Sequence, residues 1–507
     1  MPSSRWKTAA GLASLATGTY YFNFFIETVD GSGVYLSATY ARADLLIATA
    51  VLWLVSLAVS LGVLAVLRPR EGAAPAWKSA GLAVFAALML AVFIRCYLKV
   101  AGFGVTDEAL TFDWLPMRGP QQWLLAAPVV AVAVLLLWSR RPERSAALLR
   151  FLAVCGLVAV PLGAWRLVQM PLGATGLAPL AASSSSAANS AGSTAPRRVL
   201  WLVLDEFDPQ VAFGDAMDVH AAMPVMTRLR GTGVWMTQAA SPAGSTDMSL
   251  PALLLGESVS RMVYDGPALA TLRTRDERAI PFDTAHSVFG KLPQGAATGS
   301  LLGFYHPYCR ALAIGACESF GTNMGTRWYD GLANLVPKRF SGILDPMTRI
   351  TGQQASAWPA MAADATKALT VLHLNLPHLP SRYAERRAGV TARGASDAYR
   401  LNLELTDKVV GDIAQAFQQA APAQEQLLIV SSDHWWRARG RHTPHPALLL
   451  LRLRNDGQPL VVDNPVSSQH LAQLALAFLQ GDLPSHDAIR QWYLKQPYVP
   501  TWIPHAD

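Results

Sequence analysis

Two pairs of neighbouring side chains in this chain have the chemistry of cation ligands. Asp205 and Glu206 follow the apolar run VLWLVL, and Asp433 and His434 follow the run LLIVSS. The carboxyl ends of strands are where open α/β sheets place ligands and catalytic groups. Carboxylates and an imidazole that meet there would bind a hard or borderline cation such as zinc. For Asp205, capping of a helix that follows the strand is the alternative.

The segment Ser241–Gly256 (SPAGSTDMSLPALLLG) adds a hydroxyl to this set. We interpret it as a strained loop that presents Thr246 to the cation, which would stabilise the threonine alkoxide as a nucleophile. A capped helix start fits the same residues equally well. Ser245 and Ser249 offer two further hydroxyls, and the spacing alone does not choose among the three.

Histidines gather near the ends of the predicted strands. Five of the eleven lie in two short segments, namely His373, His378, His434, His442 and His445. Consecutive Asp-His followed by two tryptophans is unusual for plain packing, so His434 is the strongest ligand candidate among them. For His373 and His445 we expect solvated loop positions.

The C-terminal part, residues 198–507, has the pattern of an α/β domain. Short apolar runs alternate with helical patterns, which predicts a central sheet covered by helices on both faces. The runs are Val199–Leu204, Thr370–Leu374, Leu427–Val430 and Ala447–Leu453, and the helical patterns are Ser396–Gln419 and Gln469–Leu479.

The N-terminal part, residues 1–175, is dominated by apolar segments of about the length that crosses a hydrocarbon core of about 30 Å. We expect an α-helical transmembrane bundle with five spans, at Lys7–Phe25, Leu45–Leu67, Trp77–Tyr97, Gln122–Trp138 and Leu148–Met170. The first segment is the weakest, and four spans are the alternative. It has no convincing cleavage site before Glu27, so we expect it to be retained rather than removed as a signal peptide.

The charges of the short loops predict the orientation. With five spans, the loops on one side carry a basic set: Arg5, Lys7, Arg68, Arg70, Lys78, Arg140, Arg141, Arg144 and Arg150. The opposite loops are mainly acidic. The positive-inside rule then places the N-terminus in the cytoplasm and the large domain outside, whereas four spans would place that domain inside. Arg95 and Arg166, near the outer ends of their spans, are expected to snorkel, with contact to a lipid phosphate as the alternative.

A flexible tether is expected between the two parts, over residues 176–197. Its segment Leu180–Pro196 (LAASSSSAANSAGSTAP) has no charge and no aromatic residue. The net charge of +7 comes largely from the basic loops and scattered arginines. Because no basic tract with interleaved aromatic residues is present, nucleic acid is not an expected partner.

Cys309 and Cys317 are close enough in sequence for a disulfide that closes a short loop, which an oxidising compartment such as a periplasm would allow. Two free buried thiols are the alternative. The spacings of a cysteine-ligated zinc site are absent from the sequence.

The order of these motifs resembles that of the alkaline phosphatase and sulfatase superfamily. The residues are the acids after the first strand, Gly-x-Thr-x-x-Ser-x-Pro at Gly244–Pro251, His-x-Pro at His378, Ser-Asp-His at His434 and a last histidine. The closest resemblance is to membrane-anchored phosphoethanolamine and phosphoglycerol transferases. Five spans followed by an external catalytic domain is their architecture, and Tyr399–Asp407 (YRLNLELTD) and the cysteine pair are similar too.

The resemblance implies roles for individual residues. Thr246 falls where the family threonine becomes phosphorylated. Its cation would be zinc, or else manganese, magnesium or calcium, held with Asp433, His434 and one of the two acids. Asp205 is slightly favoured, although the phosphoethanolamine transferases would place the ligand at Glu206. His378 and His442 would hold the phosphoryl group or a second cation.

A formylglycine sulfatase is disfavoured by the same alignment. In sulfatases the convertible cysteine is followed by Pro-x-Arg and then an apolar run that ends in Gly. When that run is set against PALLLG, Thr246 stands at the cysteine position and Leu250 at the arginine position.

The expected activity is transfer of a phospholipid head group, phosphoethanolamine or phosphoglycerol, onto an envelope glycan or lipid through a phosphothreonine. The chain would then be a multi-pass protein of a bacterial inner membrane with its catalytic domain in the periplasm. Two alternatives remain open: a phosphodiesterase, phosphatase or other sulfatase-like hydrolase, in which water is the acceptor, and a catalytically degenerate structural membrane component.

Overall fold

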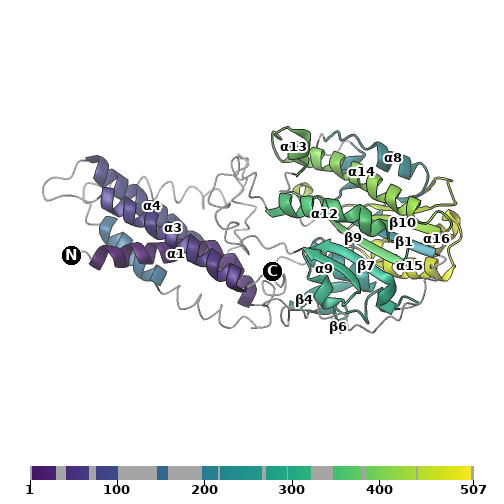
Figure 1. Cartoon of the computed structure of the whole chain (residues 1–507), viewed down its shortest axis with the longest axis horizontal. Coiled ribbons are helices and arrows are strands. Elements are labelled where there is room, and N and C mark those ends of the chain that lie inside the picture. Colours follow the sequence, from purple (N-terminus) through teal and green to yellow (C-terminus); the bar gives the residue numbers. More distant parts are fainter. Residues whose placement is uncertain are drawn as a thin grey trace. The chain divides into compact units, whose positions relative to one another are not determined.

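The computed structural model describes residues 3–29, 42–67, 76–100, 145–157, 197–214, 217, 219–264, 270–293, 295–320, 346–379, 383–440 and 443–503. These residues fall into two compact units (Figure 1). One contains the helices up to Leu157, and the other contains every described strand. Each unit is described by itself below.

The N-terminal unit is helical, with α1 (Ser3–Val29), α3 (Arg42–Val66), α4 (Ala76–Val100) and a further helix at Ser145–Leu157. Helices α1, α3 and α4 therefore lie where the first three spans are expected. Within the described residues, one window, Thr49–Val66 in α3, is long and apolar enough to cross a membrane, with a mean hydropathy of 2.3. The span at Gln122–Trp138 and the end of the last one lie outside the described residues. The five-span topology stays a prediction.

Small residues let two helices of this unit approach closely. A Cβ atom on Gly11 of α1 would overlap the backbone of Ala153, and one on Gly156 would overlap the backbone of Gly11. Trp53 of α3 donates a hydrogen bond from its indole nitrogen to the Ser14 hydroxyl, at 3.0 Å. Close backbone approach at small residues is a common way for apolar helices to associate.

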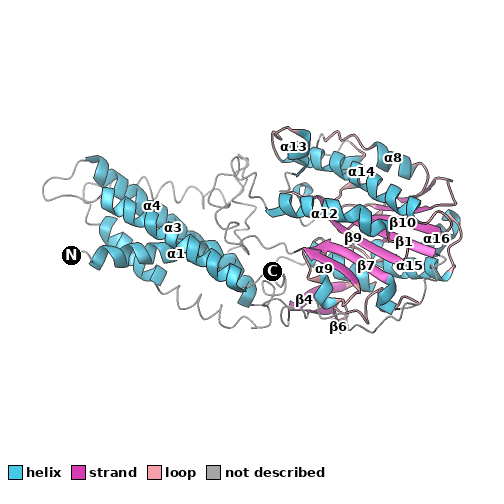
Figure 2. Cartoon of the chain, viewed as in Figure 1, coloured by secondary structure: helices cyan, strands magenta, loops and turns pink. Residues whose placement is uncertain are grey.

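The second unit is built on a mixed sheet that has eight strands within the described residues, in the order β12-β2-β11-β10-β1-β9-β7-β8. Figure 2 shows the strands of this unit in magenta, with helices around them. The central strands β10, β1, β9, β7 and β8 are parallel to one another, and β11 runs antiparallel to β10. The strands are β1 (Arg197–Asp205), β2 (Val234–Met236), β7 (Gly299–Phe304), β8 (Ala316–Phe320), β9 (Leu369–Pro377), β10 (Glu425–Ser432), β11 (Leu449–Leu453) and β12 (Leu460–Val462).

Two smaller sheets and a helix linked to β8 by a disulfide accompany the main sheet. The smaller sheets are β4 (Val259–Tyr264) with β5 (Ala270–Thr274) and β6 (Ala279–Pro281), and β3 (Ala239–Ala240) with β13 (Val466–Ser467). The short helix α10 (Tyr308–Ala311) is joined to β8 by a disulfide between Cys309 and Cys317, which confirms the predicted pairing.

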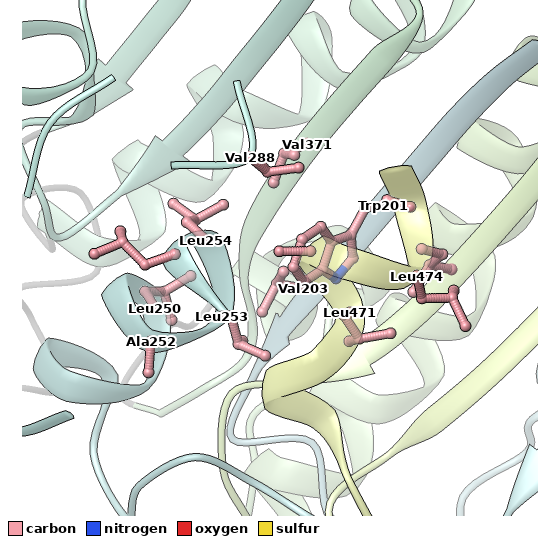
Figure 3. Packing of buried hydrophobic residues seen from close by; sticks show 14 of the residues in the cluster. Trp201, Val203, Leu250, Ala252, Leu253, Leu254, Val288, Val371, Leu471 and Leu474 are labelled. Atoms are coloured by element: carbon pink, nitrogen blue, oxygen red, sulfur yellow. The ribbon is translucent and has the colours of Figure 1, made fainter. Parts of the chain in front are cut away.

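Helices cover both faces of the main sheet, as predicted. The bounds are α7 (Pro209–Ala212), α8 (Pro224–Arg230), α9 (Thr246–Leu255), α12 (Pro346–Ala363), α13 (Tyr383–Ala388), α14 (Ala395–Ala420), α15 (Leu471–Gln480) and α16 (His486–Leu494). One face packs on α8, α12 and α14, and the other on α9, α15 and α16. Figure 3 shows Trp201 and Val203 of β1 among the leucines of α9 and α15.

The apolar side chains of β1 alternate between the two faces of the sheet, which explains why both faces are buried. Leu200, Leu202 and Leu204 belong to the core beneath α14, whereas Trp201 and Val203 belong to the core beneath α9. Successive side chains of a strand point to opposite faces, so a continuous apolar run requires cover on both sides. The Trp201 indole nitrogen is satisfied by the Ser431 hydroxyl of β10, at 2.9 Å.

Candidate active site

Four predicted residues meet at the carboxyl ends of β1 and β10. We call Asp205, Thr246, Asp433 and His434 the inner cluster. The Thr246 hydroxyl lies 2.8 Å from Asp433 Oδ2, 3.4 Å from Asp205 Oδ1 and 3.2 Å from His434 Nε2. All four side chains are buried. Because β1 and β10 are adjacent and parallel, residues more than 200 positions apart reach the same point of the sheet edge.

Backbone groups fix the orientation of the two residues after β10. Asp433 Oδ1 accepts hydrogen bonds from the backbone N–H of Glu206 (3.0 Å) and of His434 (2.7 Å), which leaves Oδ2 to face Thr246. His434 Nδ1 donates to the Trp435 carbonyl at 2.9 Å. This bond places the ring proton on Nδ1, so Nε2 faces the cluster with its lone pair.

The structure distinguishes among the three candidate hydroxyls. Thr246 is the first residue of α9, after Ser245, whose backbone is extended, so the strained-loop interpretation is wrong. The helix start is correct, but the Ser245 side chain forms no capping hydrogen bond. The Ser249 hydroxyl donates to the Ala243 carbonyl (2.8 Å) and accepts from the Ala243 N–H (3.1 Å), which commits it to holding the preceding loop. Of the three, Thr246 is the hydroxyl that lies in the inner cluster.

The electrostatics of the inner cluster favour a bound cation. Burial, together with the nearby charges of Asp433 and Glu206, raises the pKa of Asp205 well above its ordinary value. Burial acts on Asp433 in the same direction, but His434, His373 and a backbone N–H outweigh it and lower the pKa of Asp433. Oxygen or nitrogen atoms of Asp205, Asp433 and His434 all lie within 4.8 Å of one another. Two buried carboxylates, an imidazole and a hydroxyl fit a divalent cation such as zinc.

Glu206 lies beside the inner cluster and faces other partners. Its backbone has a φ of 61°, a strained conformation for a residue other than glycine. Its carboxylate forms an ion pair with Arg437 Nε at 2.8 Å and lies 3.8 Å from His378 Nε2. We call Glu206, His378 and Arg437 the outer cluster. The side chains of His378 and Arg437 are 21% and 22% exposed, so this cluster forms the more accessible side of the site.

Arg437 was not predicted from the sequence as a residue of the site. Burial opposes its charge, but Glu206, Asp205 and Asp433 outweigh burial and hold the pKa of Arg437 above its ordinary value. The side chain also donates from Nη2 to His434 Nε2 at 3.3 Å. Its place three residues after His434 was visible in the sequence. Its pairing with Glu206, far away in sequence, was not.

A buried network holds the segment that carries Arg437. The Tyr399 hydroxyl of α14 donates to the Glu206 carbonyl at 2.6 Å, and the Tyr399 ring stacks on Trp436 at 4.2 Å between centroids. Arg439 forms a salt bridge with Asp208, with Nη1 at 3.0 Å from both carboxylate oxygens. The residues on both sides of Arg437 are therefore anchored near the end of β1.

The remaining histidines fall into different settings. His373 is buried in β9, where Nδ1 lies 3.0 Å from the Tyr308 hydroxyl, so its expected solvated loop position is wrong. The signal against that expectation was its place inside the apolar run Thr370–Leu374. His306 was not singled out, yet its Nε2 donates to the Thr246 carbonyl at 3.3 Å. His445 is partly buried, with Nε2 3.4 Å from the Arg439 carbonyl. His442 lies outside the described residues.

Comparison with known proteins gives structural similarity without sequence similarity. No family model and no curated protein matches the chain. Among solved structures, a phosphonate monoester hydrolase from Silicibacter pomeroyi is 15% identical, with a TM-score of 0.38, covering 56% of this chain and 73% of that one. The C-terminal periplasmic domain of phosphoethanolamine transferase EptC from Campylobacter jejuni is 11% identical, with a TM-score of 0.35, covering 56% of this chain and 89% of that one.

A protein of the alkaline phosphatase superfamily from Vibrio parahaemolyticus is also similar, at 14% identity and a TM-score of 0.35, covering 60% of this chain and 70% of that one. Sulfatases are among the other similar structures. These proteins are of the kinds that the motif order resembles, the alkaline phosphatase and sulfatase superfamily. At these TM-scores the similarity by itself assigns no activity to the chain.

Proposed function

We propose that this protein is a metal-dependent phosphoryl-group transferase of the alkaline phosphatase and sulfatase superfamily, with Thr246 as its nucleophile. The observation that carries the proposal is the position of the Thr246 hydroxyl, buried at the N-terminus of α9 within 3.4 Å of two carboxylates and an imidazole. A hydroxyl needs such surroundings to become a nucleophile.

In the first step, the Thr246 oxygen attacks the phosphorus of a phosphodiester and the bond to the leaving alkoxide breaks. The Thr246 hydroxyl, which donates to Asp433 Oδ2 at 2.8 Å, would give its proton to water once the cation is bound, because Asp433 Oδ2 would then be a ligand. The phosphothreonine formed carries its charge at the start of α9, where the helix dipole favours an anion. An acceptor hydroxyl or phosphate then attacks the phosphorus, and Thr246 is released.

Asp205, Asp433 and His434 would hold the cation together with Thr246. When bound, zinc or another divalent ion lowers the pKa of a coordinated hydroxyl and stabilises developing negative charge. Glu206, although implied as a ligand by the resemblance, faces Arg437 and His378 instead. We therefore propose Asp205 as the acidic ligand from β1. His378 would protonate the departing alkoxide, with His442 beside the phosphoryl group.

The donor proposed is a membrane phospholipid, and the acceptor a glycan or lipid of the envelope. The apolar helix at Thr49–Val66 supports attachment to a membrane, where a lipid phosphodiester is at high local concentration. The multi-pass topology, the periplasmic location of the catalytic unit and phosphoethanolamine or phosphoglycerol as the transferred group all belong to the same proposal.

Covalent labelling tests this function. Full-length protein in detergent, loaded with zinc, is incubated with a phospholipid that carries radioactive phosphate in its head group. We expect label on Thr246, identified by peptide mapping, and complete loss of label in Thr246→Ala. Ser249→Ala serves as a matched control, because Ser249 lies on the same helix outside the inner cluster, and it should retain the label.

Other outcomes separate the alternatives. Label on Ser245 or Ser249 would refute the choice of nucleophile. Release of free head group into water, with no modified glycan, would identify a hydrolase. A protein that binds no divalent cation, and whose Thr246→Ala variant keeps the cellular phenotype, would be a structural component.

A further inference from the structure

We infer that Arg437 is a substrate-binding residue of this site, which takes an oxygen of a phosphoryl or similar tetrahedral oxyanion. The inference rests on the proposed function and deepens it, because it names the side chain that receives the anion. Two of the contacts of Arg437 carry the inference, one to a carboxylate of the outer cluster and one to an imidazole of the inner cluster.

Binding of the proposed cation would preserve the contact of Arg437 with Glu206 and break its contact with His434. The ion pair of Arg437 Nε with Glu206 Oε1, at 2.8 Å, uses groups that the proposed cation does not need. The hydrogen bond from Arg437 Nη2 ends on His434 Nε2, at 3.3 Å, which is the lone pair of the proposed cation ligand. His434 Nε2 cannot coordinate a cation and accept that hydrogen bond at the same time. Metal loading therefore breaks this hydrogen bond, and the guanidinium group can direct that N–H toward another acceptor at the edge of the inner cluster.

Arg437 Nη2 and the Thr246 hydroxyl contact the same nitrogen, so the guanidinium group lies near the position of an oxyanion on Thr246. His434 Nε2 is within 3.2 Å of the Thr246 hydroxyl, and Arg437 Nη2 is 3.3 Å from the same nitrogen. The guanidinium group offers several donors in one plane and binds phosphate oxygens well. A side chain that is 22% exposed is also open to a substrate that arrives from solvent.

Charge balance supports the same role. Asp205, Asp433 and Glu206 carry three negative charges when ionised, and a divalent cation with Arg437 supplies three positive ones. Without Arg437, a phosphoryl dianion would enter a site with a net negative charge. Glu206 holds the guanidinium in position, and the anchors on either side, Trp436 against Tyr399 and Arg439 on Asp208, keep the backbone in place.

Two binding measurements on full-length protein in detergent test the inference. Zinc is titrated into metal-free protein, and inorganic phosphate is then titrated into zinc-loaded protein, both by calorimetry. For Arg437→Gln we expect zinc to bind at least as tightly as in wild type, because a competitor for His434 Nε2 is gone. We expect phosphate to bind at least about tenfold more weakly, because a charge-assisted hydrogen bond is lost. Arg437→Lys keeps the charge but lacks the planar fork, so its phosphate affinity should lie between those of wild type and Arg437→Gln.

Arg400→Gln is the matched control, since Arg400 is also paired with carboxylates but lies on α14 with Asp397 and Glu404 as partners. It should change neither titration. Phosphate binding within about twofold of wild type in Arg437→Gln would overturn the inference, as would a parallel loss of zinc and phosphate binding, which indicates a structural role. If Arg437→Gln does not fold, Arg437→Lys decides alone: unchanged zinc binding with weaker phosphate binding supports the inference, and unchanged phosphate binding refutes it.

Lipid labelling on the same preparations keeps the two proposals apart. Arg437-dependent phosphate binding without labelling of Thr246 would refute the transferase and leave the anion site intact. If Thr246 is labelled but phosphate binding does not depend on Arg437, the inference about Arg437 is refuted and the transferase proposal stands.

Discussion

At the scale of single residues, the adjacent acids Asp205 and Glu206 have different partners, and we propose different tasks for them: Asp205 as a cation ligand and Glu206 as the partner of Arg437. The strained backbone at Glu206, with φ of 61°, turns its side chain toward Arg437 and leaves Asp205 facing Thr246. Sequence motifs alone did not decide between the two acids, because they are neighbours after the same strand. The decision depends on a local backbone conformation and on Arg437, more than 200 residues away.

Substitution of the two acids should separate these tasks. We expect Asp205→Asn to weaken zinc binding by more than the roughly 10–100-fold that follows loss of a supporting residue, because a direct ligand is removed. Glu206→Gln should stay within that range. Zinc content after dialysis, measured by mass spectrometry, gives the comparison. A larger loss in Glu206→Gln than in Asp205→Asn would show that Glu206 is the ligand.

Two buried histidines should make the protein sensitive to acid. Burial lowers the pKa of His306 to about 3 and that of His373 to about 4, from 6.5. Below pH 6.5 these two histidines are protonated in the unfolded chain, but they stay neutral in the folded protein. Each histidine then costs roughly 1.4 kcal/mol of unfolding free energy per pH unit until the folded pKa is reached. This stability is complete above pH 6.5 and is lost as the pH falls.

The measurement is the unfolding free energy of full-length protein in chelator as a function of pH. His306→Gln has no group that titrates here, so its stability should fall less steeply than that of wild type between pH 6.5 and pH 4. The difference between the two curves isolates His306 from other groups. Equal slopes would mean that His306 is solvated or has a charged partner in the folded protein.

At the scale of elements, the disulfide joins the segment after β7 to β8 at the edge of the main sheet. Cys309 follows Tyr308, whose hydroxyl lies 3.0 Å from His373 Nδ1, and His306 just before it contacts the Thr246 carbonyl. The disulfide therefore stabilises a loop that packs behind Thr246, although it contributes no atom to the inner cluster.

Removal of the disulfide should lower the free energy of unfolding and affect the proposed activity little. For a closed loop of 8 residues, the loss of chain entropy in the unfolded state predicts about 2.5 kcal/mol of destabilisation in Cys309→Ser/Cys317→Ser. Thermal unfolding of full-length protein measures it, with wild type in reductant as the comparison. An unchanged melting temperature would mean that the loop is held by its packing alone.

The elements that sequence analysis found are those with strong local patterns. The apolar runs of β1, β9, β10 and β11 and the helical patterns of α14 and α15 all appear at the expected places. The short strands β2, β7, β8 and β12, of 3 to 6 residues, were not predicted, because so few residues carry little periodic signal. Strand β11 is equally short, but the longer apolar run Ala447–Leu453 marks it. Of the site, Thr246, Asp433 and His434 follow from motifs. Arg437 and His306 do not, because only the folded sheet brings them to Thr246.

At the scale of the whole molecule, the two units have separate hydrophobic cores. The clusters around α9 and α14 contain only residues from Val199 onward, and those around α1 contain only residues up to Ala153. A unit with its own core has what it needs to fold independently.

We therefore expect residues 197–507 alone to fold and bind zinc as the full chain does. If a membrane anchor supplies the lipid donor, this fragment should lose labelling by phospholipid in vesicles and keep activity on a small soluble phosphodiester. Circular dichroism, zinc titration and product analysis make the comparison. Failure of the fragment to fold, or full activity on vesicles, would contradict the expectation.

The pairing of β1 with β10 also has a consequence for the biosynthesis of the protein. Asp205 and Thr246 leave the ribosome early, but Asp433 and His434 follow only after almost 190 further residues, and they reach the site only when β10 has paired with β1. A nascent chain that ends before Asp433 therefore lacks two of the proposed ligands. If these residues hold a cation as proposed, its capture is one of the last events in maturation, and incomplete chains would lack activity.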